Sequence, residues 1–408
     1  MTEWIGTAEA ARRLGIKEAS LYSYVSRGLV SSRRSAGTRA SEFNAADVER
    51  LARRGRPRVA SRPGQTAAEL MIETALTEIA DDQLRYRGID AITLASQVSL
   101  EDVAALLWTG SLPEAGDEAP WTATAPAIAV GTAAQAALPA EALPLERLQV
   151  IVPALAAADP LRLHLDPPAV ATAGRCLVAG MVECLPQAGS ATAPAGGSIA
   201  ERLITRLCPD EPRAGLADVL RSTLVLLADH ELAASTLAAR VAASVRADPY
   251  AVVATGLGAV GGALHGGASF GAETMLRSAV APRDAQRVVG ELLRRGERIP
   301  GFGHFVYQGT DPRGVFVFER LRQVAPDSER LAVAEAVMTE ASSRALPAPN
   351  IDFALAAFGT VGGMISGAGE AIFAVARAVG WIAHAMEQYG RHGAIRPRGI
   401  YTGPSPAV

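Results

Sequence analysis

Residues 256–268 read G-L-G-A-V-G-G-A-L-H-G-G-A and place His265 in a run of glycine and alanine. Glycine is costly inside a helix unless the backbone must approach something closely, so this stretch indicates a ligand. His304 has a similar setting in I-P-G-F-G-H-F-V-Y, and Asp352 follows the extended segment P-A-P-N-I. Each alone is compatible with a core histidine or a helix cap. Together, three polar residues bounded by glycine or proline in an apolar chain predict a functional site.

Composition limits the class of protein. The chain has 408 residues, of which 49% are hydrophobic and 20% charged, and its net charge is -3, which excludes a largely disordered chain. This length predicts two or three domains. Three cysteines without C-x-x-C spacing argue against a disulfide framework or a zinc site. The N-terminus has no basic region followed by an apolar run, so we expect a cytoplasmic protein. The sequence shows no cluster of metal ligands, and we expect no metal to be required.

The chain beyond about residue 66 has a helical pattern. Apolar residues recur at three- and four-residue spacing, with proline or glycine between the segments. We find no convincing alternating strand, so we predict an all-α body. The expected helices include 68–79, 99–108, 145–157, 217–227, 234–246, 284–295 and 328–341.

The first 63 residues differ from the rest in charge. They contain 13 basic and 6 acidic residues, which gives +7, whereas the remainder sums to -10. A small basic head on an acidic body is typical of a protein that contacts nucleic acid. A solvated basic surface would give the same numbers, so charge alone leaves both interpretations open.

The order of elements in this head narrows the choice. Thr7 can cap a helix over 8–14, a second helix is expected over 17–27, and Asn44 can cap a third. The stretch 29–43 between them suits a β-hairpin wing whose arginines could meet phosphates. These wing arginines are Arg33, Arg34 and Arg39.

This head resembles the winged helix-turn-helix of MerR-type regulators, through T-A-E-A-A-R-R-L-G-I, L-Y-S-Y-V-S-R-G-L-V and F-N-A-A-D-V-E-R-L. The resemblance implies a dimer that places helix 17–27 in the major groove of duplex DNA. A winged helix that binds protein instead is the alternative. We expect the head over 1–55 and a linker over 56–66, before a body over 67–408.

The body resembles the citrate synthase family in a series of motifs that occur in one order over about 340 residues. In chain order they are L-R-Y-R-G (84–88), V-S-L-E-D-V-A-A-L-L-W-T-G-S-L-P (98–113), A-D-H-E-L (228–232), A-L-H-G-G-A (263–268), G-F-G-H-x-V-Y with D-P-R (301–313), P-N-I-D-F (349–353) and R-P-R-x-x-Y-x-G-P (396–404).

The resemblance implies a large helical domain (about 67–265 and 361–408) and a small one (about 266–360), with the active site between them. It also implies condensation of acetyl-CoA with oxaloacetate to citrate and CoA, with the thioester as a co-substrate and no bound cofactor. Asp352 would be the base, His265 would stabilise the enolate, and His304 would polarise the ketone and protonate the alkoxide.

Further roles follow from the same resemblance. Oxaloacetate is a dianion, and the planar guanidinium suits carboxylates. The residues implied to bind it are His230, Arg313, Arg377 and Arg396, with Arg396 supplied by the second subunit of a homodimer. The segment implied to approach CoA is Gly301, Phe302 and Gly303.

Five positions depart from the family pattern. Ala233 and Leu237 stand where the family has Asn and Phe, Ser269 and Phe270 replace an Asn-Glu pair, and Phe305 replaces a frequent Arg. None removes a proposed catalytic side chain, but the acyl pocket could differ. Two alternatives therefore stay open: a 2-methylcitrate synthase that uses propionyl-CoA, and a DNA-binding regulator whose synthase-like body senses a metabolite.

Overall fold

The computed structural model describes residues 4–14, 21, 24–25, 30–34, 41–53, 71–114, 120–194, 196–391, 393–398 and 403. The chain divides into two compact units, Met1–Met71 and Ile72–Val408, and each is considered by itself.

The first unit has a small core and one antiparallel sheet. Its described elements are β1 (Trp4–Gly6), α1 (Thr7–Leu14), β2 (Ser32–Arg34), β3 (Ser41–Asn44) and α3 (Ala45–Arg53), with strand order β1-β3-β2. Strands β2 and β3 pair within the stretch expected to form a hairpin. Asn44 Oδ1 accepts the backbone N–H groups of Ala46 and Asp47 and so caps α3. The expected helix 17–27 lies mostly outside the described residues.

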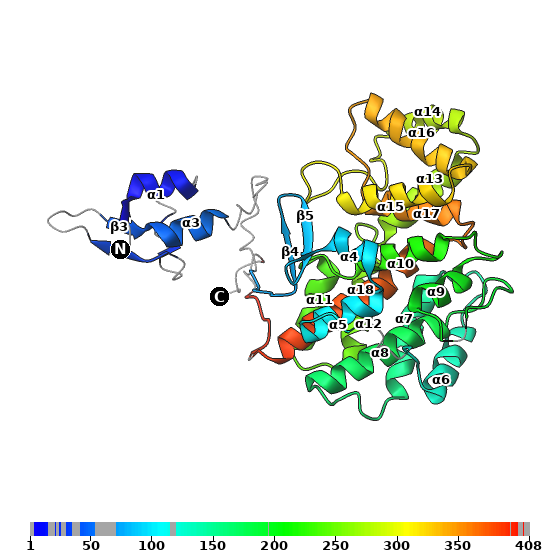
Figure 1. Ribbon diagram of the computed structural model, residues 1–408, viewed down its shortest axis with the longest axis horizontal. Coiled ribbons are helices and arrows are strands. Elements are labelled where there is room, and N and C mark those ends of the chain that lie inside the picture. The colour runs from blue at the N-terminus through cyan, green and yellow to red at the C-terminus, as the bar shows by residue number, and fades with distance from the viewer. Residues whose placement is uncertain are drawn as a thin grey trace. The chain divides into compact units, whose positions relative to one another are not determined.

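The second unit is mostly helical (Figure 1). Six of the seven helices predicted from periodicity are present within two residues of the expected ends. Its helices are α4 (Ala91–Gln97), α5 (Leu100–Thr109), α6 (Ala125–Ala136), α7 (Pro144–Ala157), α8 (Pro167–Glu183), α9 (Ile199–Leu207), α10 (Leu216–Leu227), α11 (Ala234–Ser244), α12 (Pro249–Val260), α13 (Gly267–Ser278), the short 3-10 helix η1 (Pro282–Asp284), α14 (Ala285–Arg294), α15 (Pro312–Val324), α16 (Glu329–Ser343), α17 (Ile351–Val361) and α18 (Ala368–Tyr389).

The predicted helix 68–79 is wrong, because residues 77–80 form a strand, and the body is mostly rather than entirely helical. Three short antiparallel strands lead into α4: β4 (Thr77–Ala80), β5 (Gln83–Tyr86) and β6 (Ile89–Asp90). Asp81 and Asp82 both have positive φ, 52° and 58°, as the two-residue turn of a hairpin requires. Leu84 and Tyr86 are buried on alternate positions of β5. The alternation of buried and exposed residues in these strands is too short to be distinguished from the neighbouring helical pattern in the sequence.

Helix α18 passes through the centre of the second unit and is buried along most of its length. Trp381 of α18 packs on Gly256 of α12, where an added Cβ would lie 2.5 Å from the indole. Small residues therefore allow the helices to approach closely around α18. Helices α13–α17 form a separate group (yellow to orange in Figure 1), and α17 also packs on α18. In the described part of the chain, no helix is long and apolar enough to cross a membrane.

Candidate active site

Aromatic and basic side chains from three segments meet around His230, which follows α10. The His230 ring lies 5.4 Å from the His304 ring and 5.5 Å from that of Tyr307, and its Nε2 is 3.0 Å from the Tyr307 hydroxyl. The Arg313 guanidinium is 5.5 Å from the Tyr307 ring centre. Burial, Arg313, Arg377 and His304 hold the pKa of His230 well below its usual value. The ring is therefore neutral at neutral pH.

The backbone fixes the tautomer of His304. Its Nδ1 accepts the amide N–H of Val306 at 2.9 Å and that of Tyr307 at 3.3 Å. A neutral imidazole that accepts at Nδ1 carries its proton on Nε2. Burial, with the charge of Arg313, lowers the pKa of His304 to about 4. The side chain thus offers one N–H donor at Nε2. Arg313 Nη2 lies 3.4 Å from this nitrogen and can also only donate, so the two groups are not hydrogen-bonded to each other in this tautomer.

His265 lies in the loop between α12 and α13. Its Nε2 is 2.9 Å from the Ser235 hydroxyl at the start of α11, and its ring meets Phe373 edge to face at 5.5 Å. The Arg377 guanidinium also lies over the Phe373 ring, 4.6 Å from its centre. Burial and Arg377 lower the pKa of His265 to about 4, so this histidine is also neutral.

Asp352 stands in the first turn of α17, which confirms the expected loop-to-helix junction. Asn350 caps that turn through its side chain and accepts the Asp352 amide at 2.9 Å. The Asp352 carboxylate itself has no hydrogen-bond partner among the described residues. Burial raises its pKa from 3.8 to about 6, although Arg313 and Arg377 oppose the change. A carboxylate with this pKa and open lone pairs can accept a proton near neutral pH.

The glycine segment before His304 is tied to the segment that carries Asp352. Gly303 N–H donates to Ala348 C=O at 2.8 Å, and Asn350 N–H donates to Gly301 C=O at 2.9 Å. Both glycines have positive φ, and a Cβ on Gly301 would lie 2.7 Å from the Cβ of Phe353. Glycine is therefore required there to bring the two segments together.

The two buried arginines are held in different ways. Arg313 forms two parallel bonds with Asp311, from Nε to Oδ1 at 3.0 Å and from Nη2 to Oδ2 at 2.8 Å. Burial alone would lower the pKa of Arg313, but Asp311 raises it. Arg377 donates from Nε to Leu227 C=O at 2.7 Å, and its other N–H groups have no partner among the described residues. Those donors are available to an anion.

Arg396 is not with the other arginines. It is exposed and adjoins Ile395, whose amide donates to the Ser244 hydroxyl at the end of α11 at 3.0 Å. Ser235, which contacts His265, is nine residues earlier in the same helix, about 14 Å away at 1.5 Å per residue. Arg396 of this chain therefore lies at the far end of α11 from its own His265.

Sequence reasoning missed four polar residues that support the site. Asp311 binds Arg313 and accepts the Ile351 amide at 3.1 Å, next to Asp352. Ser235 contacts His265, and the Tyr307 ring contacts the rings of both His230 and His304. Asp229 is fully buried before His230. Three of them, Asp229, Tyr307 and Asp311, lie inside the motifs quoted above, and this position in the motifs could have identified them as site residues.

The departures from the family pattern have local consequences. Ala233 is the N-cap residue of α11 and makes no side-chain cap, whereas Asn at that position could do so. Ser269 is buried against α18, where a Cβ on Gly369 would lie 2.4 Å from its hydroxyl. Phe305, next to His304, is fully exposed. None of these changes displaces His265, His304 or Asp352.

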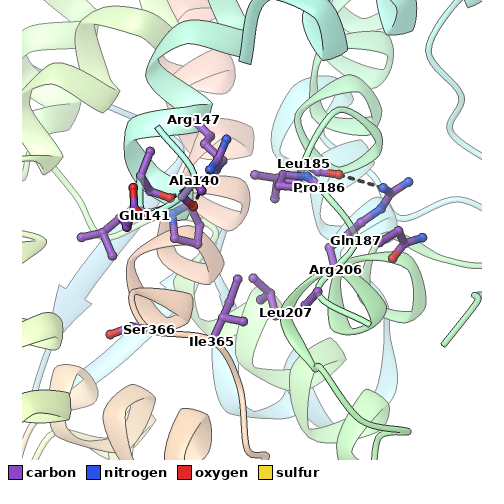
Figure 2. Close-up of a pocket in the computed structure, with 14 residues that line it drawn as sticks. Ala140, Glu141, Arg147, Leu185, Pro186, Gln187, Arg206, Leu207, Ile365 and Ser366 are labelled. Carbon is purple, nitrogen blue, oxygen red and sulfur yellow. Dashed lines mark hydrogen bonds between the residues drawn. The ribbon is translucent and has the colours of Figure 1, made fainter. Parts of the chain in front are cut away.

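A hollow of about 350 Å³ lies elsewhere in the second unit (Figure 2). Its walls come from 140–144, 185–188 and the turn at Ile365 and Ser366. The predicted site residues do not line it. Among the described residues, no group of three or more His, Cys, Asp or Glu side chains could hold a metal ion.

We predict that Asp352→Asn stabilises the fold at neutral pH. The pKa of Asp352 is about 6 folded and 3.8 unfolded, so its stabilising contribution is present below 3.8 and is lost as pH rises through 6. At pH 7.5 the charged carboxylate opposes folding, and its removal should add about 1–2 kcal/mol to the free energy of unfolding. Urea denaturation should show the gain at pH 7.5 and little at pH 5. An equal gain at both would contradict the assignment.

Comparison with known proteins identifies the family and its similar members. The family described as "Citrate synthase, C-terminal domain" matches residues 67–398. Citrate synthase 2 of Bacillus subtilis is 31% identical over 81% of this chain and 93% of its own length, and the citrate synthase of Haloferax volcanii is 33% identical over 82% and 94%. A 2-methylcitrate synthase of Corynebacterium glutamicum is 30% identical over 81% and 92%.

Solved structures show the same fold. Citrate synthase from Thermotoga maritima covers 84% of this chain and 96% of its own, with a TM-score of 0.68 and 25% identity. Citrate synthase from Thermoplasma acidophilum, solved in a ternary complex with carboxymethyl coenzyme A and oxaloacetate, covers 83% of this chain and 96% of its own, with a TM-score of 0.70 and 25% identity. The chain therefore belongs to the citrate synthase family.

Proposed function

We propose that this protein condenses acetyl-CoA with oxaloacetate and hydrolyses the product to citrate and CoA. The observation that carries the assignment is one proton acceptor, Asp352 with a pKa of about 6, in a site with two neutral histidines of pKa about 4. A thioester methyl group is a very weak acid. Its proton leaves only when a base and a stabiliser of the enolate oxygen act together.

The steps can be assigned to named atoms. The Asp352 carboxylate takes a proton from the thioester methyl group while His265 donates a hydrogen bond to the enolate oxygen. The methyl carbon then forms a bond to the ketone carbon of oxaloacetate, and the resulting alkoxide takes the Nε2 proton of His304. Water then cleaves the thioester and releases CoA. Arg313, Arg377 and His230 bind the oxaloacetate carboxylates and carbonyl.

The body would work as two domains. We propose a large domain of about 67–265 and 361–408 and a small domain of about 266–360, with the substrates between them. This division puts Asp352 and His304 on the small domain and Arg377 and His230 on the large one. Gly301, Phe302 and Gly303 would approach CoA through backbone groups.

We predict that Asp352→Asn and His265→Ala each reduce CoA release by at least about 1,000-fold, because the first removes the base and the second removes the stabiliser of the enolate oxygen. In the unchanged protein, kcat/KM should fall as pH drops through about 6, where Asp352 becomes protonated. The measurement is release of free CoA from acetyl-CoA, with and without oxaloacetate.

The matched control is His164→Ala, since His164 is exposed on a loop away from these contacts. Turnover retained by Asp352→Asn would refute the role of the base. Propionyl-CoA is assayed in parallel. A higher kcat/KM with propionyl-CoA would favour the 2-methylcitrate synthase alternative, and no release with either thioester would favour the regulator.

We further propose a homodimer. Helices α6, α11 and α12 carry a single charged residue, Arg240, and that residue is buried. Their outer sides expose Val130 and Val241, at 42% and 40%. Uncharged helix faces of this kind are typical of surfaces that another subunit covers. A second copy is the occupant because the site needs Arg396, which this chain holds at the far end of α11.

A mixing experiment tests the shared site. Asp352→Asn and Arg396→Ala are each expected to be nearly inactive alone. In a mixed dimer, the site on the Arg396→Ala chain keeps its own Asp352 and receives Arg396 from the other chain. Unfolding and refolding an equal mixture should restore about a quarter of normal activity, since half of the dimers are mixed and each has one intact site. No recovery from verified mixed dimers would place Arg396 in its own site.

For the head, we propose a winged helix-turn-helix of the MerR type that binds duplex DNA. The three-stranded sheet, the α1 and α3 helices and the excess of basic residues support this. Arg34 of the wing is exposed. Arg33 is only partly available, since its Nε donates to Glu42 at 2.8 Å and its guanidinium stacks 4.4 Å from the Trp4 ring. Arg39 lies outside the described residues.

We predict salt-dependent binding of the full chain to duplex DNA. Replacing Arg33, Arg34 and Arg39 with Ala should weaken binding and reduce the slope of log K against log salt by about 1 per lost phosphate contact. Fluorescence anisotropy at several salt concentrations measures both quantities. Replacing Arg213, an exposed arginine of the second unit, provides the control. Binding that is unchanged by the wing substitutions would place the contact elsewhere.

A further inference from the structure

A network of hydrogen-bonded, buried polar side chains begins at the residue before His230. The preceding residue, Asp229, is fully buried, and its Oδ2 accepts hydrogen bonds from the Thr77 hydroxyl at 2.5 Å and from His384 Nε2 at 3.1 Å. His384 is also fully buried, in the middle of α18. A charge in the protein interior costs several kcal/mol unless it is well compensated. Neither Asp229 nor His384 has a role in the reaction steps proposed above.

Arg240 sets the direction of the hydrogen bonds. Its Nη1 lies 3.0 Å from His384 Nδ1, and a guanidinium can only donate. His384 therefore accepts at Nδ1 and donates its Nε2 proton to Asp229. Arg240 is held in turn by Glu387 Oε2 at 2.7 Å and Gln388 Oε1 at 3.2 Å. The hydrogen bonds therefore all run in one direction, from Arg240 through His384 to the Asp229 carboxylate, which is the final acceptor.

The charge of Asp229 also acts on Arg377. Burial would raise the pKa of Asp229, but His384 and Arg377 hold it below the usual value. In return, the carboxylate counteracts the effect of burial, which lowers the pKa of Arg377. In the described part of the chain, no carboxylate is hydrogen-bonded to Arg377. Arg377 instead donates from Nε to Leu227 C=O at 2.7 Å, two residues before Asp229, so the Asp229 charge acts on Arg377 without the direct contact that Asp311 makes with Arg313.

Close packing restricts the position of Asp229 and of the backbone around it. A Cβ added to Gly380 of α18 would lie 2.3 Å from Ala228 C=O and 2.6 Å from Asp229 Oδ1. On another side, the Tyr86 hydroxyl donates to Asp229 C=O at 3.0 Å. Glu231, just beyond His230, has a φ of +56°, which is unfavourable for a residue other than glycine. The backbone of His230 is thus held between α18 and β5.

We propose that Asp229 and His384 are positioning residues for the oxaloacetate site. His384 fixes the Asp229 carboxylate, and Asp229 holds both the His230 side chain and the charged Arg377 where the substrate needs them. Neither residue touches the substrate. The proposal rests on the proposed condensation and deepens it by adding the groups that orient the oxaloacetate-binding side chains.

The test compares three substitutions at constant temperature and pH. His384→Ala removes the donor to Asp229 and should raise the KM for oxaloacetate about 10-fold or more, while the KM for acetyl-CoA changes less than about twofold. His384→Gln should recover most of this loss, because its amide can donate to Asp229 and accept from Arg240. His164→Ala, at an exposed histidine, should leave both constants unchanged.

Gly380→Ala gives a second approach if His384→Ala fails to fold. It keeps every polar group, but its methyl group would displace Asp229, so the KM for oxaloacetate should rise selectively again. A purely structural role would lower stability and kcat without separating the two KM values. If the KM for oxaloacetate stays unchanged in folded His384→Ala and Gly380→Ala, the proposal is overturned.

Binding measurements separate this proposal from the proposed function. If the unchanged protein releases no CoA, the condensation is refuted, and calorimetry with oxaloacetate alone still tests the positioning role. Weaker binding by His384→Ala than by His384→Gln would support the role. Equal binding by the two variants and the unchanged protein would overturn it.

Discussion

Two buried guanidinium groups, Arg313 and Arg377, impose the main constraint on this site. A buried cation needs a counter-charge, and each has an aspartate: Asp311 in direct contact and Asp229 nearby. Both aspartates also lie next to residues to which we assign roles in the proposed reaction. Asp311 accepts the amide of the residue before Asp352, and Asp229 directly precedes His230. Charge compensation and the placement of the reacting groups are therefore produced by the same side chains.

The same environment separates the protonation behaviour of the site residues. Burial disfavours every charged form, so it lowers the pKa of His265 and His304 and raises that of Asp352. The arginines strengthen the first effect and weaken the second. The result is two neutral hydrogen-bond donors and one carboxylate that titrates near pH 6. This is the division of roles that enolate formation requires, and it follows from burial beside cations.

The sequence predicted the parts of the structure that depend on local pattern. Long amphipathic helices and motif residues such as His304 could be placed, because periodicity and glycine spacing are local. The hairpin 77–90 was missed, since its strands are only two to four residues long and its first turn is Asp81-Asp82 rather than a glycine pair. The contact between Asp229 and His384 spans 155 residues. A single histidine in an apolar helix gives no signal of such a partner.

The charges of the buried side chains also support the proposed dimer. Arg313 is already neutralised by Asp311 and has its Nε and one Nη2 proton engaged. Arg377 is partly compensated by Asp229, and the neutral histidines add no positive charge. Oxaloacetate would therefore meet less than two uncompensated cations in an isolated protomer. In the proposed dimer, a second copy would supply an additional arginine, Arg396, which in this chain is exposed and lies at the far end of α11 from His265.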